Sequence, residues 1–170
     1  MTSQFTGRII GGAFGVVFVQ ANAGALPQGV ARPVRLLAVA AFLALFVTRR
    51  GRGSRAELPA PRTGFGRRYW YVVAAEVLAL VVGLLVISRV LHAPHAFVGW
   101  IAFVVGVHFF GLAASWRRPA LHVLGAALAA CGLGALALAA LDAPAWAVAT
   151  AGGIVPGALL LASVWRTPAA

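Results

Sequence analysis

The sequence predicts an all-α membrane protein, a single domain in which about six transmembrane helices form a bundle of three helical hairpins. Hydrophobic residues make up 62% of the 170 residues and charged residues 10%, whereas soluble domains have about 45–50% and about 25%. The apolar residues form long runs, and arginines are concentrated at the ends of these runs, as in bilayer proteins. A soluble chain of this length could not cover so much apolar surface.

Six apolar runs define the predicted helices. Crossing a bilayer takes about 20 residues, and at least about 17, which the last four runs reach comfortably. The first run is diluted by glycines, Gln20 and Asn22, and the second run is short. The predicted helices comprise residues 9–26, 33–48, 69–91, 95–115, 120–141 and 144–164.

The first run has a second interpretation, as a cleaved signal peptide. Arg8, the apolar stretch and the triplet Ala21-Asn22-Ala23 resemble a signal with a small-residue cleavage site. The basic region holds a single arginine, which favours a retained helix over a cleaved signal.

Arginine placement predicts the orientation of the helices. All 14 basic residues are arginines, and with six spans eleven lie on one side of the membrane and three on the other. Because positive charge is enriched on the cytoplasmic side, we expect both termini and the arginine-rich segment 49–68 in the cytoplasm of a bacterial inner membrane. The smaller group is Arg32, Arg35 and Arg89, and the larger is Arg8, Arg49, Arg50, Arg52, Arg55, Arg62, Arg67, Arg68, Arg117, Arg118 and Arg166.

The arginine-rich segment is a candidate contact for anionic lipid headgroups. Its glycines and prolines predict a flexible linker, and each arginine near an anionic surface gains about 1 kcal/mol. The alternative is that the charges only set the topology. The net charge of +11 does not indicate nucleic-acid binding, because no stretch can form a soluble basic face. The candidate headgroup ligands are Arg49, Arg50, Arg52, Arg55, Arg67 and Arg68.

The second half of the chain contains an internal repeat of about 50 residues, units 67–116 and 117–166. Arg67-Arg68 recurs as Arg117-Arg118, and Ala93-Pro94 recurs as Ala143-Pro144, each at an offset of 50 residues. Proline cannot continue a helix and marks the turn, while arginine marks the cytoplasmic end. Each unit therefore predicts one outgoing helix, a turn and a return helix.

Glu76 and His108 are the residues most able to carry chemistry. Glu76 follows Arg68 by eight residues and His108 precedes Arg117 by nine, which places them about 12 Å and about 13 Å from the same side. A tight turn joins their helices, so the two side chains can meet at one depth. The surrounding candidates Tyr69 and Ser115 share their helix faces, at a spacing of seven residues.

An intramembrane Glu–His pair has two interpretations. It can hold and pass a proton or bind a polar ligand, because ionisable residues at this depth usually mark functional sites. It can also simply lock two helices together, although hydrogen bonds in membranes average below about 1 kcal/mol. The second repeat unit has Ala126 where the first has Glu76.

The remaining polar and sulfur residues favour packing and anchoring over catalysis. Arg89, His92 and His95 are predicted to be interfacial, because Pro94 interrupts His92-x-x-His95 and no further metal ligand is near. The lone Cys131 suits packing. No enzyme, cofactor or metal signature is evident. The tryptophans, predicted to form interfacial belts, are Trp70, Trp100, Trp116, Trp146 and Trp165.

Two stripes of glycine predict close helix contacts. The first is Gly7, Gly11 and Gly15, and the second is Gly153 and Gly157. Small residues at this spacing let helices approach closely. The contact can lie within one chain, which is favoured, or join two copies in a homo-oligomer.

Two stretches, GRIIGGAFGVVFVQANAGALP (7–27) and GWIAFVVGVHFFGLAASWRRP (99–119), resemble small uncharacterised multi-pass membrane proteins of high-GC, actinobacterial-type bacteria. The resemblance implies a membrane class and no activity. The sequence therefore favours a small transporter or a ligand- or proton-handling membrane protein that uses Glu76 and His108. The alternative is a non-catalytic accessory or scaffold protein that binds other membrane proteins or anionic lipids.

Overall fold

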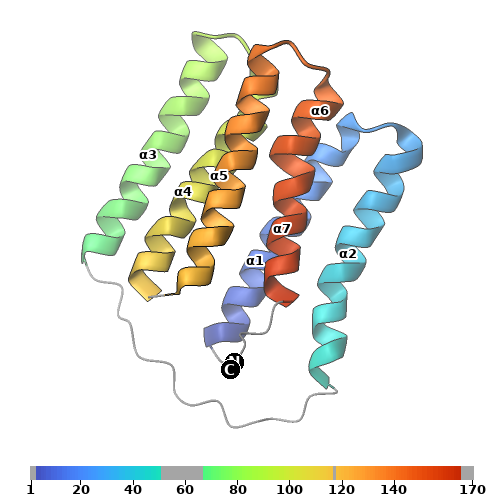
Figure 1. Ribbon diagram of the computed structural model, residues 1–170, viewed down its shortest axis with the longest axis vertical. Coiled ribbons are helices and arrows are strands. Elements are labelled where there is room, and N and C mark those ends of the chain that lie inside the picture. The colour runs from blue at the N-terminus through green and yellow to red at the C-terminus, as the bar shows by residue number, and fades with distance from the viewer. Residues whose placement is uncertain (1–2, 51–66, 117, 166–170) are drawn as a thin grey trace.

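The computed structural model describes residues 3–50, 67–116 and 118–165, and every regular element in these ranges is helical. The ranges contain six long helical stretches (Figure 1). The elements are α1 (Ser3–Asn22), η1 (Ala23–Ala25), α2 (Gln28–Arg50), α3 (Arg67–Arg89), η2 (Pro94–Ala96), α4 (Phe97–Trp116), α5 (Pro119–Ala140), α6 (Ala145–Ala149), the π-helix η3 (Thr150–Ile154) and α7 (Val155–Trp165). The last three are consecutive and form one stretch.

α2 extends beyond its predicted run at both ends, and α3 begins before its predicted run. α2 starts at Gln28 instead of residue 33 and runs through Pro33. Pro33 is the sixth residue of α2, where it removes the hydrogen bond to the carbonyl of Gly29, yet the helix continues through it. α2 ends at Arg50 and α3 begins at Arg67, so both ends of segment 49–68 are helical. Residues 51–66, with Arg52 and Arg55, lie outside the described residues.

Four of the helical stretches in the described ranges are long and apolar enough to cross a membrane. α1 and α3 are not among them over their described residues. The predicted helical bundle is therefore confirmed, with four candidate membrane spans. These spans are Gln28–Val47, Pro94–Ala114, Pro119–Ala140 and Ala145–Trp165.

Consecutive helices run antiparallel, so the turns after α1, α3 and α5 lie together at the upper end in Figure 1. We call this the hairpin end, and the opposite end, where α1 and α3 begin, the arginine end. The turns after α3 and α5 share a left-handed residue, because His92 and Asp142 both have φ of 51°. Histidine and aspartate adopt this conformation more readily than most residues. The two residues are 50 positions apart, the spacing of the sequence repeat.

The tightest packing joins neighbouring hairpins and not the two helices of one hairpin. Between α4 and α5, a Cβ at Gly106 would overlap the backbone of Ala129, and a Cβ at Gly132 would overlap that of Phe103. Here the two helix backbones touch, because only glycine leaves the space. Leu128, on the same face of α5, is fully buried.

The predicted glycine stripes meet each other inside the chain, where α1 packs on η3 and α7, except for Gly7, whose Cβ would meet nothing within 4 Å. A Cβ at Gly15 would lie 2.8 Å from the carbonyl oxygen of Gly157, and one at Gly11 would lie 3.4 Å from Val164. Gly153 lies against Asn22 in the same way. These contacts give the glycines a packing role within one copy of the chain.

α2 and α3 lie at the two edges of the bundle (Figure 1). α2 packs mainly on α1, and α3 packs on α4 and the adjoining turn η2. Much of the apolar surface of α3 is therefore exposed, as at Leu78 and Leu85. In a bilayer, lipid would cover this surface.

Candidate functional site

Glu76 on α3 and His108 on α4 meet, as their matched depths predict. Nδ1 of His108 lies 2.6 Å from Oε2 of Glu76. This is slightly shorter than a usual charge-assisted N–H···O hydrogen bond, which measures about 2.7–2.9 Å. The Glu76 side chain is 15% exposed and the His108 side chain is 35% exposed, so the imidazole is the more accessible of the two groups.

A second contact sets the register of α3 against α4. The ring of Trp100 packs on Gly83, where a Cβ would overlap it, and its Nε1 donates to the carbonyl oxygen of Leu80 at 3.3 Å. Gly83 follows Glu76 by seven residues and Trp100 precedes His108 by eight. The antiparallel helices therefore touch at two levels about two turns apart.

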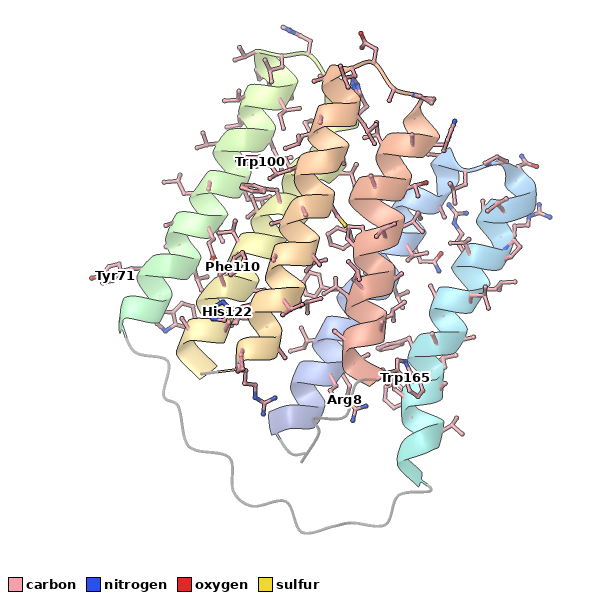
Figure 2. The ribbon with its side chains drawn as sticks, in the orientation of Figure 1. Arg8, Tyr71, Trp100, Phe110, His122 and Trp165 are labelled. Carbon is pink, nitrogen blue, oxygen red and sulfur yellow. The ribbon has the colours of Figure 1, made fainter. Side chains whose placement is uncertain are left out.

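Trp100, predicted for an interfacial belt, packs against α3. Figure 2 shows its ring beside α3, and its indole N–H is bonded to the α3 backbone. Trp146 and Trp165 are the exposed tryptophans of the last helical stretch. The sequence could have indicated this contact, because Trp100 and Gly83 lie at matching levels on neighbouring antiparallel helices. A tryptophan ring can pack this closely on a helix only at a residue without a side chain.

The other two predicted members of the site lie on the correct helices. Tyr69 is seven residues before Glu76 on α3, and Ser115 is seven residues after His108 on α4. The backbone thus places both residues about two helical turns closer to the arginine end than the pair. Their side chains lie outside the described residues.

The pair lies in an apolar contact between two helices. The ring centroid of Phe109 lies 6.3 Å from that of His108 in an edge-on arrangement. Nε2 of His108 and Oε1 of Glu76 have no hydrogen-bond partner within residues 3–50, 67–116 and 118–165. A groove of about 420 Å³ exists at the hairpin end, but neither residue lines it. The pair therefore lies in the contact between α3 and α4, away from the groove, with the imidazole as its accessible side.

The predicted interfacial residues gather at the hairpin end. Arg89 ends α3 and is exposed. His92 Nδ1 lies 3.2 Å from the carbonyl oxygen of Val90, and His95 Nε2 lies 3.3 Å from that of Ala139. The two imidazoles thus bond to different backbone carbonyls. No group of three potential metal ligands occurs in the described ranges.

The candidate headgroup ligands lie at the arginine end as far as they are described. Arg49 and Arg50 end α2, and Arg67 and Arg68 begin α3. The side chains of these four arginines lie outside the described residues.

Two polar links that the sequence did not indicate hold α1 in place. Arg8 Nε donates to the carbonyl oxygen of Val164 at 2.8 Å, where α1 meets α7 at the arginine end (Figure 2). Gln20 Nε2 donates to the carbonyl oxygen of Arg35 at 3.1 Å, and an Arg35 guanidinium nitrogen lies 3.4 Å from the carbonyl oxygen of Gln20. Each links α1 to another helix through a backbone carbonyl, which has no signature in side-chain patterns.

No protein-family profile matches the chain, and it shows no detectable similarity to a curated protein or to a solved structure. The chemistry of the site therefore follows from its own residues: an acid and an imidazole joined across two helices, within otherwise apolar sequence.

Proposed function

We propose that all six helical stretches cross the bacterial inner membrane, with both termini and the arginine end in the cytoplasm. The four apolar spans and the antiparallel order of the helices support this arrangement. The arginine bias supports the orientation. The arginines at the ends of α2 and α3 would then lie at the level of anionic headgroups, which attract them.

We propose that the protein handles protons, or a small polar solute exchanged for protons, at the Glu76–His108 pair. The contact of 2.6 Å between Nδ1 and Oε2 carries this proposal. Ionisable side chains are expensive at this depth and usually serve transport or binding. An acid bonded to an imidazole is a common proton relay.

The pair alternates between a neutral state, when it holds one dissociable proton, and a state of net charge −1 after that proton leaves. With one dissociable proton it is neutral, as imidazolium beside carboxylate or as imidazole beside carboxylic acid. A proton that arrives at Nε2 of His108 lets the Nδ1 proton pass to Oε2 of Glu76. Loss of the proton leaves a net charge of −1, which is costly among apolar helices. Release is therefore favoured when a cationic solute replaces the proton.

Proton flux into proteoliposomes tests this proposal. A potassium gradient with valinomycin drives the flux, and a trapped pH dye reports it. We expect Glu76→Gln and His108→Gln each to lower the flux at least tenfold, because each removes one proton-binding group. Asp142→Asn is the matched control, since it changes an exposed acid in a turn and should leave the flux unchanged.

Three results would contradict proton handling at this pair. They are wild-type flux no greater than that of protein-free vesicles, full flux in either variant, or an equal loss in Asp142→Asn. Infrared difference spectra supply a second readout. A carboxyl band that responds to pH in the wild type and is lost in Glu76→Gln would assign the proton to this residue.

A second candidate function is that of an accessory protein, in which the pair only holds α3 in place. The position of the pair between two helices, away from the groove, favours this candidate. The exposed apolar face of α3 would then contact another membrane protein. Mild purification from native membranes should retain that protein, or an anionic lipid, and Leu78→Ala with Leu85→Ala should release a bound protein. Purification without either companion would count against this function.

A further inference from the structure

Arg32 and Arg35 place two positive charges on one face of α2 at the hairpin end. They are three residues apart, so their side chains lie on the same side of the helix. Arg35 falls within the candidate membrane span Gln28–Val47, where an ionisable side chain is rare and usually functional. Neither arginine forms an ion pair in the part of the chain that the structure describes. The two charges therefore lack a counterion from these residues.

The positions of these arginines in their helix are unfavourable, unlike that of Arg89. A helix has a partial positive charge at its start and a partial negative charge at its end. Arg89 ends α3, where a positive charge is stabilised. Arg32 and Arg35 follow the first turn of α2, which has no acidic residue, and helical arginines point back towards the helix start. Like charges at this spacing also repel each other, so a bound anion would stabilise both.

The guanidinium of Arg35 reaches back from α2 to the turn η1. Its Nη2 lies 3.4 Å from the carbonyl oxygen of Gln20, which is long for a hydrogen bond. Its Nε is buried and has no hydrogen-bond partner among the described residues. An arginine has five N–H donors, so most donors of this one are unused within the described chain. Water can solvate the exposed donors, but it does not neutralise the charge.

The turn before α2 leaves space beside the two guanidinium groups. A Cβ at Gly24 would meet only Nη2 of Arg35 among the described atoms, at 3.4 Å, and a Cβ at Gly29 would meet nothing within 4 Å. Both glycines are exposed, and so is Arg32. A ligand can therefore approach the arginines from outside the hairpin end.

We propose that Arg32 and Arg35 bind a phosphate group, supplied by a phospholipid headgroup or by inorganic phosphate. The charge of the site selects an anion, and the guanidinium fork matches the oxygens of carboxylate and phosphate. One fork occupies both oxygens of a carboxylate, whereas a phosphate has four oxygens and can accept from two arginines at once. In the six-span arrangement proposed above, this site lies at the outer headgroups, opposite the arginine end.

Phosphorus NMR of the full chain in maltoside micelles tests this site. A nitroxide is attached at Val30→Cys, an exposed position of α2, in a Cys131→Ser background that removes the other thiol. The nitroxide broadens the signal of phosphates bound nearby, and the arginine end is about 30 Å away along α2. The probes, titrated separately, are phosphatidic acid and inorganic phosphate. We expect the phosphatidic acid signal to broaden, and the broadening to disappear when ascorbate reduces the nitroxide.

Removing either guanidinium should weaken phosphate binding. We expect Arg32→Gln and Arg35→Gln each to raise the half-saturating lipid concentration about tenfold, as for the loss of one hydrogen bond between charged groups. Arg89→Gln is the matched control, because it removes an exposed positive charge at the same end of the bundle and should leave binding unchanged. Arg32 is exposed, so Arg32→Gln tests the site even if Arg35→Gln unfolds.

The two probes distinguish the sources of the phosphate. Broadening of inorganic phosphate that depends on both arginines would identify free phosphate as the ligand, and a response to phosphatidic acid alone would identify the headgroup. Four results would overturn the proposal: no broadening of either probe, unchanged half-saturation in Arg32→Gln, an equal loss in Arg89→Gln, or displacement of phosphatidic acid by diacylglycerol with the same chains. The readout does not involve proton flux, so its failure would leave the Glu76–His108 proposal intact.

Discussion

α4 packs against its two neighbours in opposite ways. Towards α5 it presents glycines, and the two backbones touch at Gly106 and Gly132. Towards α3 it presents His108 and Trp100, two large polar side chains that bond across the gap. One helix therefore has a contact built from backbone and another built from side chains.

The difference shows which part of the bundle can respond to a proton. The α4–α5 contact gains its stability from van der Waals packing, which protonation does not alter. The α3–α4 contact depends on an ionisable pair, and α3 has few other neighbours. Protonation would therefore act on the edge helix and leave the glycine-packed centre unchanged.

The largest expected effect comes from adding a methyl group to the glycine contact between α4 and α5. Gly132→Ala places a Cβ where the backbone of Phe103 lies, so the two helices must separate. We expect a loss of about 2 kcal/mol in the free energy of unfolding, as for other overpacked cores, measured by reversible unfolding in mixed micelles.

Gly134→Ala is the matched control for that variant. It lies two residues away on α5, and its Cβ would meet nothing within 4 Å. Alanine is the better helix former by about 1 kcal/mol, so this variant should be as stable as the wild type or slightly more stable. Equal losses in both variants would refute the backbone contact.

A smaller effect is expected from breaking the polar pair. A double-mutant cycle of Glu76→Gln and His108→Gln should give a coupling energy of about 1.5 kcal/mol, near the upper end for intramembrane hydrogen bonds. The cycle is read from unfolding free energies at neutral pH. Strictly additive losses would mean that the two side chains do not interact.

The smallest effect is expected from the indole link. Trp100→Phe keeps a ring over Gly83 and removes the N–H that donates to Leu80. We expect a loss of about 0.6 kcal/mol, the average for a hydrogen bond in a membrane helix bundle. Cross-linking of cysteines placed on α3 and α4 would report whether the register is kept. A shifted register would mean that the N–H, and not the ring, aligns the helices.

Hydropathy and arginine placement predicted the helices. The matched depths of Glu76 and His108 predicted that these two side chains meet. Counting residues from Arg68 and Arg117 was enough to bring Glu76 and His108 together, because a helix rises by a constant amount per residue. The same counting missed the α4–α5 contact. A spacing of seven residues separates Gly99 from Gly106 on α4 and Gly125 from Gly132 on α5. In a glycine-rich membrane sequence, this spacing does not identify which two helices pack together.

The sequence by itself determined the all-helical class, the order of the hairpins and the matching levels of Glu76 and His108. These follow from local rules, namely hydrocarbon thickness, helix rise and the cost of charge in lipid. The tertiary structure decided that the hairpins join through α4–α5 and α1–α7, that the pair lies away from the groove, and that the groove opens at the hairpin end. These features depend on which helix faces fit together, and side-chain shape settles that only when distant segments meet.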